Sequence, residues 1–428
     1  MTSLNRKRLR LWLVLSFCVG ATTWLYVHQI LIPWGDAKNL QEMELKAQMG
    51  DLYSPWVGTH ELLRHGRNPY GQEVSHDIQM VFYGHAIQQT YGEPGVGVVN
   101  EQRFAYPVYV VFLLGPTVYA DFAQVQRWAP FVLGLLTAIS VVLCLDILHW
   151  LSGEAAIALV LFTLSSPQIV QGLRLEQLAL VVGCLLTAGT WCVHRGYLVA
   201  AGVFLAFSTI KPQMALLPLV WFILWALGEW STRRRLLTGF GITMAALAGA
   251  GELLLPGWLS YFFAGMAAYR KYFPTTSHLR LLLGDTLGIV VSAFIVIWLL
   301  AFGWRNRKVA GDSQRFALVV AAFLMATALT FPLFTPFNQA LLILPALLVV
   351  REWTTLPKLS RVTFIAIVSW PWITSVVLLL LRPAVNPAST VALLPAFMVS
   401  FVPLILPVLL FSRRQIVGVH VDEDAVTG

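Results

Sequence analysis

The sequence predicts an all-α, polytopic membrane protein with about twelve membrane-spanning helices. Three observations lead to this fold class. Hydrophobic residues make up 57% of the 428 residues and charged residues only 12%, about half the charge of a typical soluble domain. Many windows reach the roughly 20 apolar residues that a helix needs to cross a bilayer. The basic residues fall between these windows, in the pattern that orients membrane proteins.

The apolar windows predict the spanning helices in order. The first follows the basic residues at positions 6–10 and runs from Leu11 to about Ile32. It is too long for a signal peptide, so we expect an uncleaved membrane anchor. The other spanning helices are expected over residues 127–149, 155–171, 176–193, 197–210, 213–229, 236–255, 285–303, 314–331, 338–350, 362–381 and 390–411.

Three polar segments complete a single integral membrane domain over residues 1–428. The first, residues 33–126, holds ten of the 21 acidic residues and one apolar run, 106–120. That run is short and contains Pro107 and Pro116, so we expect it to lie on the membrane or dip into it. The second segment is 256–284, and the third is the polar tail 415–428.

The positive-inside rule predicts the orientation, provided that 106–120 does not span. Both termini then lie in the cytoplasm, and the first two polar segments lie outside. The basic residues that fall on the cytoplasmic side are Arg195, Arg233, Arg234, Arg235, Arg305, Arg307, Lys308, Arg351, Lys358, Arg361, Arg413 and Arg414. We expect a bacterial inner membrane protein whose site faces the extracytoplasmic side.

The outer turns carry a different set of side chains. The segment from Gly50 to Tyr70 contains two acids, Asp51 and Glu61, with aromatic residues, two histidines and an Asn-Pro-Tyr turn. Other outer turns supply cations, amides and one acid: Gln171, Arg174, Glu176, Gln177, Lys211, Gln213, Arg270, Arg280 and Asn338. Cations near one leaflet suit a phosphate headgroup, and a carboxylate can act as a general base. Taken singly, most of these residues are typical of interfacial anchors or solvated loops.

Other classes of site have weaker support. The basic residues are dispersed and match no nucleic-acid-binding motif, so no nucleic-acid partner is expected. All four cysteines lie inside apolar windows, which argues against disulfides or a cysteine metal site. His60 and His65 are five residues apart, off the spacing of helical metal ligands. We therefore expect no essential metal and no cofactor.

Four sequence features, taken in order, resemble glycosyltransferase family 87 of the GT-C superfamily of membrane glycosyltransferases. They are the stretch from Gly50 to Gly71, Tyr106-Pro107 before a short apolar helix, Glu176-Gln177 at the start of a leucine-rich helix, and Lys211-Pro212-Gln213. The family often reads Gly-Gln-x-Asn where this chain has Glu176-Gln177-Leu178-Ala179. Members include mannosyltransferases of phosphatidylinositol mannosides.

The resemblance implies a GT-C fold and an activity. The donor would be a polyprenyl-phosphate-linked sugar and the acceptor an extracytoplasmic lipid or glycan. Asp51 matches the family's catalytic base, with Asp36 as the second choice. Lys211 and Arg174, then Arg270 and Arg280, are expected to hold the donor phosphate. The residues expected to contact the substrates are Tyr53, Tyr70, Gln177, Gln213 and Asn338.

Three alternatives stay open at the level of sequence. A transporter or a flippase for lipid-linked sugars would also need many spanning helices, but it predicts polar residues near the bilayer midplane, where few occur. A non-catalytic membrane scaffold would tolerate substitution of Asp51 and Lys211. The third alternative is an enzyme of the same fold that transfers a group other than a hexose. The sugar is expected to be mannose or another hexose or pentose.

Overall fold

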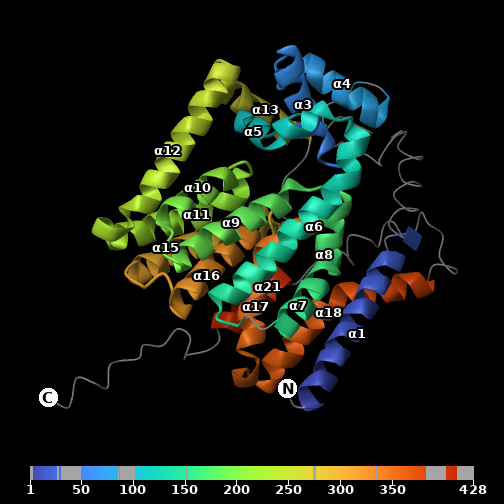
Figure 1. Ribbon diagram of the computed structural model, residues 1–428, viewed down its shortest axis with the longest axis vertical. Coiled ribbons are helices and arrows are strands. Elements are labelled where there is room, and N and C mark those ends of the chain that lie inside the picture. The colour runs from blue at the N-terminus through green and yellow to red at the C-terminus, as the bar shows by residue number, and fades with distance from the viewer. Residues whose placement is uncertain are drawn as a thin grey trace.

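The computed structural model describes residues 3–26, 28–29, 50–84, 86, 102–150, 153–272, 276–333, 335–381 and 402–411. Within these ranges the chain folds into helices joined by turns and contains no strand (Figure 1). The predicted all-α class is therefore confirmed for this part of the chain. Asp36, the expected second choice of base, and the tail 415–428 lie outside the described residues.

Most of the helices form one bundle. In chain order they are α1 (Ser3–Tyr26), α6 (Phe122–Ile147), α7 (Gly153–Leu164), α8 (Pro167–Arg174), α9 (Leu178–His194), α10 (Leu198–Ser208), α11 (Pro212–Gly228), α12 (Trp230–Leu254), α14 (His278–Leu283), α15 (Asp285–Asn306), α16 (Gln314–Thr330), η4 (Pro336–Leu342), α17 (Ile343–Arg351), η5 (Trp353–Thr355), α18 (Lys358–Leu381) and α21 (Val402–Phe411). Most of the apolar windows coincide with these helices. The window 155–171 is divided between α7 and α8, and residues 30–32 and 390–401 of the first and last windows lie outside the described residues.

A second group of elements, here called the cap, lies at the top of Figure 1. It consists of α3 (Tyr53–His65), α4 (Gln72–Tyr83), η2 (Val108–Val110), α5 (Val111–Leu114), η3 (Gly115–Tyr119) and α13 (Trp258–Tyr272). The Tyr70 hydroxyl donates to the Tyr106 carbonyl at 2.6 Å, and the Tyr70 ring meets Phe104 edge-on at 5.1 Å. The cap thus joins both predicted outer segments, 33–126 and 256–284.

Helix α16 is the centre of the bundle, since every residue from Phe316 to Leu329 is buried. Trp221 of α11 packs against Phe316 and Phe323 of α16, with ring centroids 5.8 and 5.7 Å away. Close helix contacts also depend on glycine: a Cβ on Gly202 of α10 would lie 2.3 Å from the Leu236 carbonyl of α12. Small residues allow such close backbone approach in membrane bundles.

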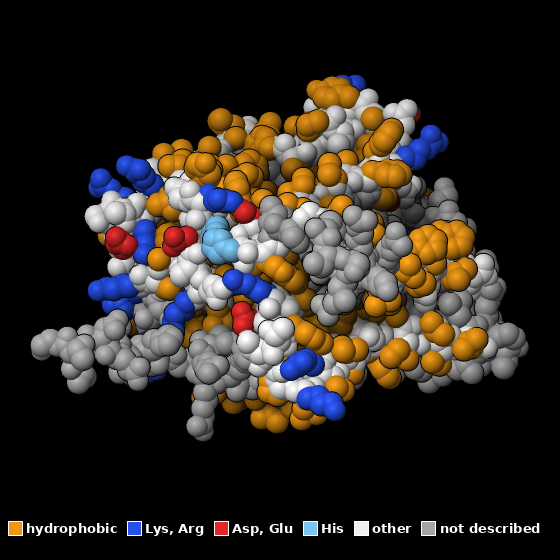
Figure 2. All heavy atoms as spheres, turned by 60° about the horizontal axis from the view of Figure 1, so that its bottom comes forward, with side chains coloured by type: hydrophobic (Ala, Val, Ile, Leu, Met, Phe, Trp, Pro, Cys, Tyr) orange, Lys and Arg blue, Asp and Glu red, His pale blue; other side chains and the backbone are white. Residues whose placement is uncertain are grey.

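The outside of the bundle is largely apolar. Leu253 of α12 is 87% exposed and Phe294 of α15 is 69% exposed. Figure 2 shows hydrophobic side chains over much of one face and Lys and Arg gathered on the left of it. Extended exposed apolar surface marks a membrane or protein contact. The apolar helices are consistent with a membrane-embedded protein.

The number of membrane crossings stays a prediction. Among the described residues three helices, α6, α12 and α15, are long and apolar enough to cross a membrane. The expected helix over 155–171 is broken: α7 ends at Leu164, α8 begins at Pro167, and the two are bent by 61°. Pro167 starts a new helix because proline lacks the N–H that would continue the first one. Counted as one span, this pair makes four, against about twelve expected.

The expected short helix at 106–120 is confirmed as short. Val108–Tyr119 is an apolar helix of fewer than 18 residues, interrupted by 3-10 turns next to Pro116. At 1.5 Å per residue it falls well below the roughly 30 Å of a bilayer core. The Tyr109 hydroxyl meets Thr209 Oγ1 at 2.9 Å, which ties this helix to the turn after α10.

Candidate functional site

The site begins at the turn Gly50–Asp51, directly before α3. The Asp51 amide donates to the Leu175 carbonyl at 2.8 Å, and this hydrogen bond fixes the turn against the end of α8. Asp51 is partly buried. Its carboxylate therefore faces the first residues of α9, although 126 positions separate Asp51 from Gln177.

Gln177 connects Asp51 to a buried lysine. Its Nε2 donates to Asp51 Oδ2, and its Oε1 accepts from Lys211 Nζ at 3.0 Å. Gln177 precedes the first residue of α9, and Lys211 precedes the first residue of α11. Proline at position 212 begins α11 and leaves Lys211 in the turn. Three predicted site residues from three separate segments thus meet in one hydrogen-bonded chain.

Burial shapes the charges of this acid–amide–lysine site. Gln177 is 4% and Lys211 9% exposed. Burial lowers the pKa of Lys211 to about 8, and the Asp51 charge opposes that shift. Burial raises the pKa of Asp51, while Lys211 and the Gln177 hydrogen bond act in the opposite direction. Each group therefore loses and gains its proton closer to neutrality than in water.

Helix η4 packs beside Lys211. Lys211 Nζ lies 5.3 Å from the centre of the Phe337 ring, a distance at which a cation is attracted to the ring face. Asn338, a predicted substrate contact, is buried, and its Nδ2 donates to Thr335 Oγ1 at 2.6 Å. Its Oδ1 has no hydrogen-bond partner. Asn338 therefore offers a free acceptor on the segment that contacts Lys211.

Glu176 was noted in the sequence beside Gln177 but was not predicted as a site residue. It differs from the Gly of the family's Gly-Gln-x-Asn pattern, and its position beside Gln177 was the available signal. The structure buries it, with 2% exposed, in the left-handed region at φ 53°. Its Oε2 has no hydrogen-bond partner. An unpartnered buried carboxylate oxygen is costly and needs an explanation.

The other predicted site residues are placed less directly. Tyr53 packs its ring on Phe122 at 4.8 Å, and Arg280 is paired with Asp285 at 2.6 Å. Tyr70 packs within the cap. Their roles in binding substrate stay predictions. Of the remaining residues, Arg174 ends α8, Gln213 lies in the first turn of α11, and Arg270 belongs to α13, where its side chain is outside the described residues.

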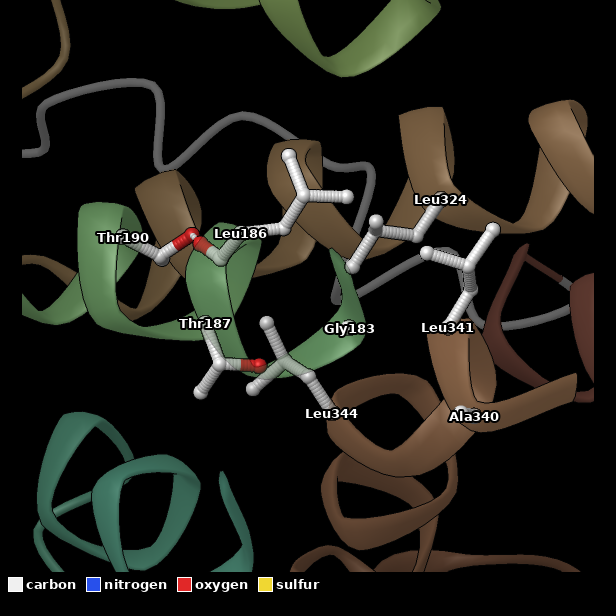
Figure 3. A pocket seen from close by; sticks show the side chains of 8 residues that line it. All are labelled: Gly183, Leu186, Thr187, Thr190, Leu324, Ala340, Leu341 and Leu344. Carbon is white, nitrogen blue, oxygen red and sulfur yellow. Dashed lines mark hydrogen bonds between the residues drawn. The ribbon is translucent and has the colours of Figure 1, made fainter. Parts of the chain in front are cut away.

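The described residues also contain a small cavity and a cluster of two histidines and a glutamate. A cavity of about 10 Å³ lies between α9, α16, η4 and α17, and Figure 3 shows Thr187 and Thr190 among its lining side chains. It holds roughly one water molecule and is too small for a sugar or a lipid. It therefore belongs to the packing of the bundle.

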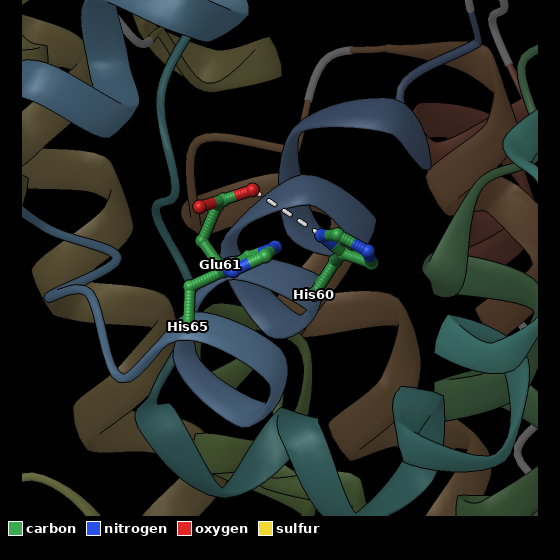
Figure 4. A group of neighbouring side chains, drawn as sticks. All are labelled: His60, Glu61 and His65. Carbon is green, nitrogen blue, oxygen red and sulfur yellow. Dashed lines mark hydrogen bonds and ion pairs between the residues drawn. The ribbon is translucent and has the colours of Figure 1, made fainter.

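His60, Glu61 and His65 form the second feature. Their ligand atoms all lie within 4.8 Å of one another on α3 (Figure 4). His60 Nδ1 is 3.2 Å from Glu61 Oε1, and Arg67 Nη1 donates to Glu61 Oε2 at 3.0 Å. Both carboxylate oxygens thus have partners, and a metal ion would compete with the guanidinium. We interpret the group as an ion network that orders the end of α3.

The fold and the site define an apolar helical protein in which Asp51, Gln177 and Lys211 form a hydrogen-bonded acid–amide–lysine chain. No protein-family model, curated protein or solved structure matches the chain. The functional argument therefore depends on the chemistry of the site itself.

Proposed function

We propose that the protein is a membrane glycosyltransferase that moves a sugar from a polyprenyl-phosphate donor to an extracytoplasmic lipid or glycan acceptor. The observation that carries this proposal is the chain from Asp51 through Gln177 to Lys211. It provides one general base and one cation, held apart by an amide. These are the two groups that displacement of a lipid phosphate by a hydroxyl requires.

In the proposed mechanism Asp51 removes the proton from an acceptor hydroxyl. The hydroxyl oxygen attacks the anomeric carbon, and the bond from that carbon to the phosphate oxygen breaks on the opposite face. The configuration is therefore inverted. Lys211 stabilises the negative charge that develops on the leaving polyprenyl phosphate. Gln177 keeps the base and the cation from neutralising each other by direct contact.

The acceptor atoms around this chain favour a substrate rich in hydroxyl groups. In the described part of the chain, the buried side-chain oxygens without a hydrogen-bond partner belong to Gln171, Glu176 and Asn338. Gln171 lies on α8, whose Gly172 faces Phe337 of η4, so all three segments adjoin the site. Sugar hydroxyls are donors that would satisfy such oxygens.

Sugar transfer in membranes tests the proposal. Radiolabelled polyprenyl-phosphate mannose is the donor, and the wild type is compared with Asp51→Asn and with Asp121→Asn. Asp121 is an exposed acid at the start of α6 and serves as the matched control. We expect Asp51→Asn to lower the rate by about 10²- to 10⁴-fold at equal protein level, the usual contribution of a general base. Asp121→Asn should keep the wild-type rate.

Other outcomes of this experiment distinguish between a different base, a transferase and a flippase. Full activity of Asp51→Asn would keep the enzyme class and reject the base, which would direct attention to Asp36. A wild type that transfers neither mannose nor arabinofuranose would argue against the transferase. If it then moves a lipid-linked sugar across reconstituted vesicles, the flippase replaces it.

A further inference from the structure

His149 follows the end of α6 in a backbone conformation that usually belongs to glycine. Its amide donates to the Asp146 carbonyl at 2.9 Å, and the Trp150 amide donates to the Leu145 carbonyl at 2.9 Å. These two hydrogen bonds define a Schellman motif, whose left-handed position is most often glycine. His149 occupies that position with a φ of 50°. Histidine tolerates the left-handed region better than most side chains, but glycine adopts it without steric cost.

Helix α9 packs against α6 and ends with the same motif, with glycine at the corresponding position. The Gly196 amide donates to the Val193 carbonyl at 3.0 Å, and the Tyr197 amide donates to the Cys192 carbonyl at 2.7 Å. Gly196 has a φ of 80°. Because glycine is sufficient for the turn after α9, the geometry of the motif does not explain the imidazole of His149.

The His149 ring lies beside His194, the last residue of α9. The two ring centres are 4.9 Å apart, and the ring planes are inclined by 52°. His194 is 8% exposed, and within the described part of the chain its Nδ1 has no hydrogen-bond partner. A buried ring nitrogen without a partner is costly, and the neutral imidazole is the commonest metal ligand in proteins. His149 is exposed, so a cation can reach the pair from solvent.

The separation of the two rings fits two ligands of one ion. With metal–nitrogen distances of about 2.0–2.1 Å and a tetrahedral angle, the ring centres of a bis-histidine site lie about 5 Å apart. The backbone on both sides is already fixed. Arg195 Nη2 donates to Asp146 Oδ1 at 2.6 Å, and Trp191 Nε1 donates to Asp146 Oδ2 at 2.6 Å. The ends of α6 and α9 are thus joined without the ion, so the pair of rings is pre-organised.

Carboxylates near the pair favour a cation. A Cβ on Gly311 would lie 3.2 Å from a backbone carbonyl of α9, so the turn between α15 and α16 packs on the end of α9. Asp312, the next residue, is exposed, and its negative charge acts on His194 together with that of Asp146. The guanidinium of Arg195 acts in the opposite direction, but it is paired with Asp146. An exposed carboxylate and water are suitable further ligands for an ion that two histidines hold.

We propose that His149 and His194 bind one transition-metal ion, with Zn²⁺ as the candidate, between the C-terminal ends of α6 and α9. Imidazole nitrogens with oxygen ligands suit Zn²⁺, which binds in tetrahedral sites. At about 1.5 Å per residue, the 17 residues of α9 separate this metal site from Gln177 by about 25 Å. The ion therefore takes no part in the chemistry at Asp51, and the inference does not rest on the proposed function.

Zinc binding to the purified full-length protein tests the inference. After treatment with EDTA, ZnCl₂ is titrated into the wild type, His149→Gly and His194→Gln in detergent, and bound zinc per chain is measured. Glycine suits the backbone at position 149, and glutamine fills a volume similar to that of histidine, so both variants should fold. We expect each variant to bind the ion at least about 10- to 100-fold more weakly than the wild type, the range known for weakened metal sites. Zinc should raise the melting temperature of the wild type and leave that of both variants unchanged.

His65→Gln is the matched control, because His65 belongs to the separate group on α3. This variant should bind zinc as the wild type does. If zinc binding is the same in the wild type, His149→Gly and His194→Gln, the two rings only pack against each other and the inference fails. It also fails if only one of these two variants loses zinc, since the other imidazole is then no ligand. Loss of zinc in His65→Gln alone would assign the ion to α3, and binding only in large excess of zinc, equal in all variants, would indicate an adventitious ion only.

Discussion

The two ends of α9 differ in how their charged groups are paired. At the C-terminal end Arg195 donates to Asp146 Oδ1 at 2.6 Å, and Trp191 donates to the other oxygen of the same carboxylate at 2.6 Å. On the adjoining helices Arg233 donates to the carbonyls of Trp225 at 3.0 Å and Arg307 at 2.8 Å. Arg195, Arg233 and Arg307 are among the basic residues that the positive-inside rule assigns to the cytoplasm.

At the N-terminal end of α9 the two charged groups do not contact each other directly, and some buried acceptor oxygens have no hydrogen-bond partner. Asp51 and Lys211 are connected through Gln177. Glu176 and Asn338 each retain a buried oxygen without a partner. A saturated polar network rigidifies a fold, whereas an incomplete one costs stability unless a ligand completes it. We propose from this comparison that the C-terminal end of α9 contributes mainly to stability, although His194 there also keeps a buried Nδ1 without a partner, and that the N-terminal end is the place of binding and chemistry.

After Asp51→Asn, the largest effect is expected from Lys211→Met. Removal of the cation should slow sugar transfer by about 10²- to 10³-fold, because the charge of the leaving phosphate loses its counter-charge. Methionine fills a similar volume, but it leaves Asp51 without its counter-charge and Gln177 Oε1 without its donor, so we expect a lower melting temperature and compare the rates per folded molecule. The measurements are the transfer rate and thermal unfolding in detergent. Lys358→Met, at an exposed lysine, is the control, and equal rates for both variants would remove Lys211 from the mechanism.

The free energy of unfolding of the protein should also rise at alkaline pH, because of Lys211. The pKa of Lys211 is lowered from 10.5 to about 8 in the folded protein. Between these values the unfolded chain binds more protons, so the free energy of unfolding increases with pH. The gap corresponds to about 3 kcal/mol as an order of magnitude. Chemical unfolding from about pH 8 to about pH 10.5 should show this rise in the wild type and lose it in Lys211→Met.

Near the C-terminal end of α9, Arg233→Met should lower the free energy of unfolding without changing the rate of transfer. This substitution removes the Arg233 donor from the carbonyl groups of Trp225 and Arg307 and leaves the Val309 carbonyl with only the Trp225 indole as a donor. It also removes the guanidinium that lies 4.1 Å from the centre of the Trp225 ring. We expect a loss of about 2 to 3 kcal/mol, as several modest hydrogen bonds and one cation–π contact disappear. The transfer rate per folded molecule should stay unchanged. The exposed Arg234→Met is the control, and a specific loss of activity in Arg233→Met would contradict the division of roles.

Local chemistry explains what could be predicted from the sequence. Apolar runs predicted the helices, because burial or lipid contact requires an apolar surface along the whole helix. Lys211-Pro212 predicted a lysine at a helix start, and the structure confirms that Pro212 begins α11. The break between α7 and α8 was missed, although Pro167 was visible, because the apolar run continued across it.

Long-range contacts explain what could not be predicted. Gln177 joins Asp51 across 126 positions and Lys211 across 34, and no local pattern specifies which side chains meet after folding. The Tyr70 hydroxyl donates to the Tyr106 carbonyl across 36 positions, another contact that no local pattern specifies. The left-handed backbone of Glu176 was equally invisible, because glycine is the residue that sequence reasoning associates with that conformation.

The smallest effect is expected from Trp191→Phe at the C-terminal end of α9. Phenylalanine keeps the ring but removes the N–H that donates to Asp146 Oδ2 at 2.6 Å. Arg195 still pairs with that carboxylate at 2.6 Å, so the loss should be about 1 kcal/mol, the net value of one hydrogen bond. Thermal unfolding should be compared with Trp298→Phe, at a partly exposed indole that stacks on Phe302. An unchanged melting temperature in Trp191→Phe would mean that Arg195 alone fixes the Asp146 carboxylate. The stability of the C-terminal end of α9 would then come from the Arg195–Asp146 ion pair and from the carbonyl groups that accept from Arg233.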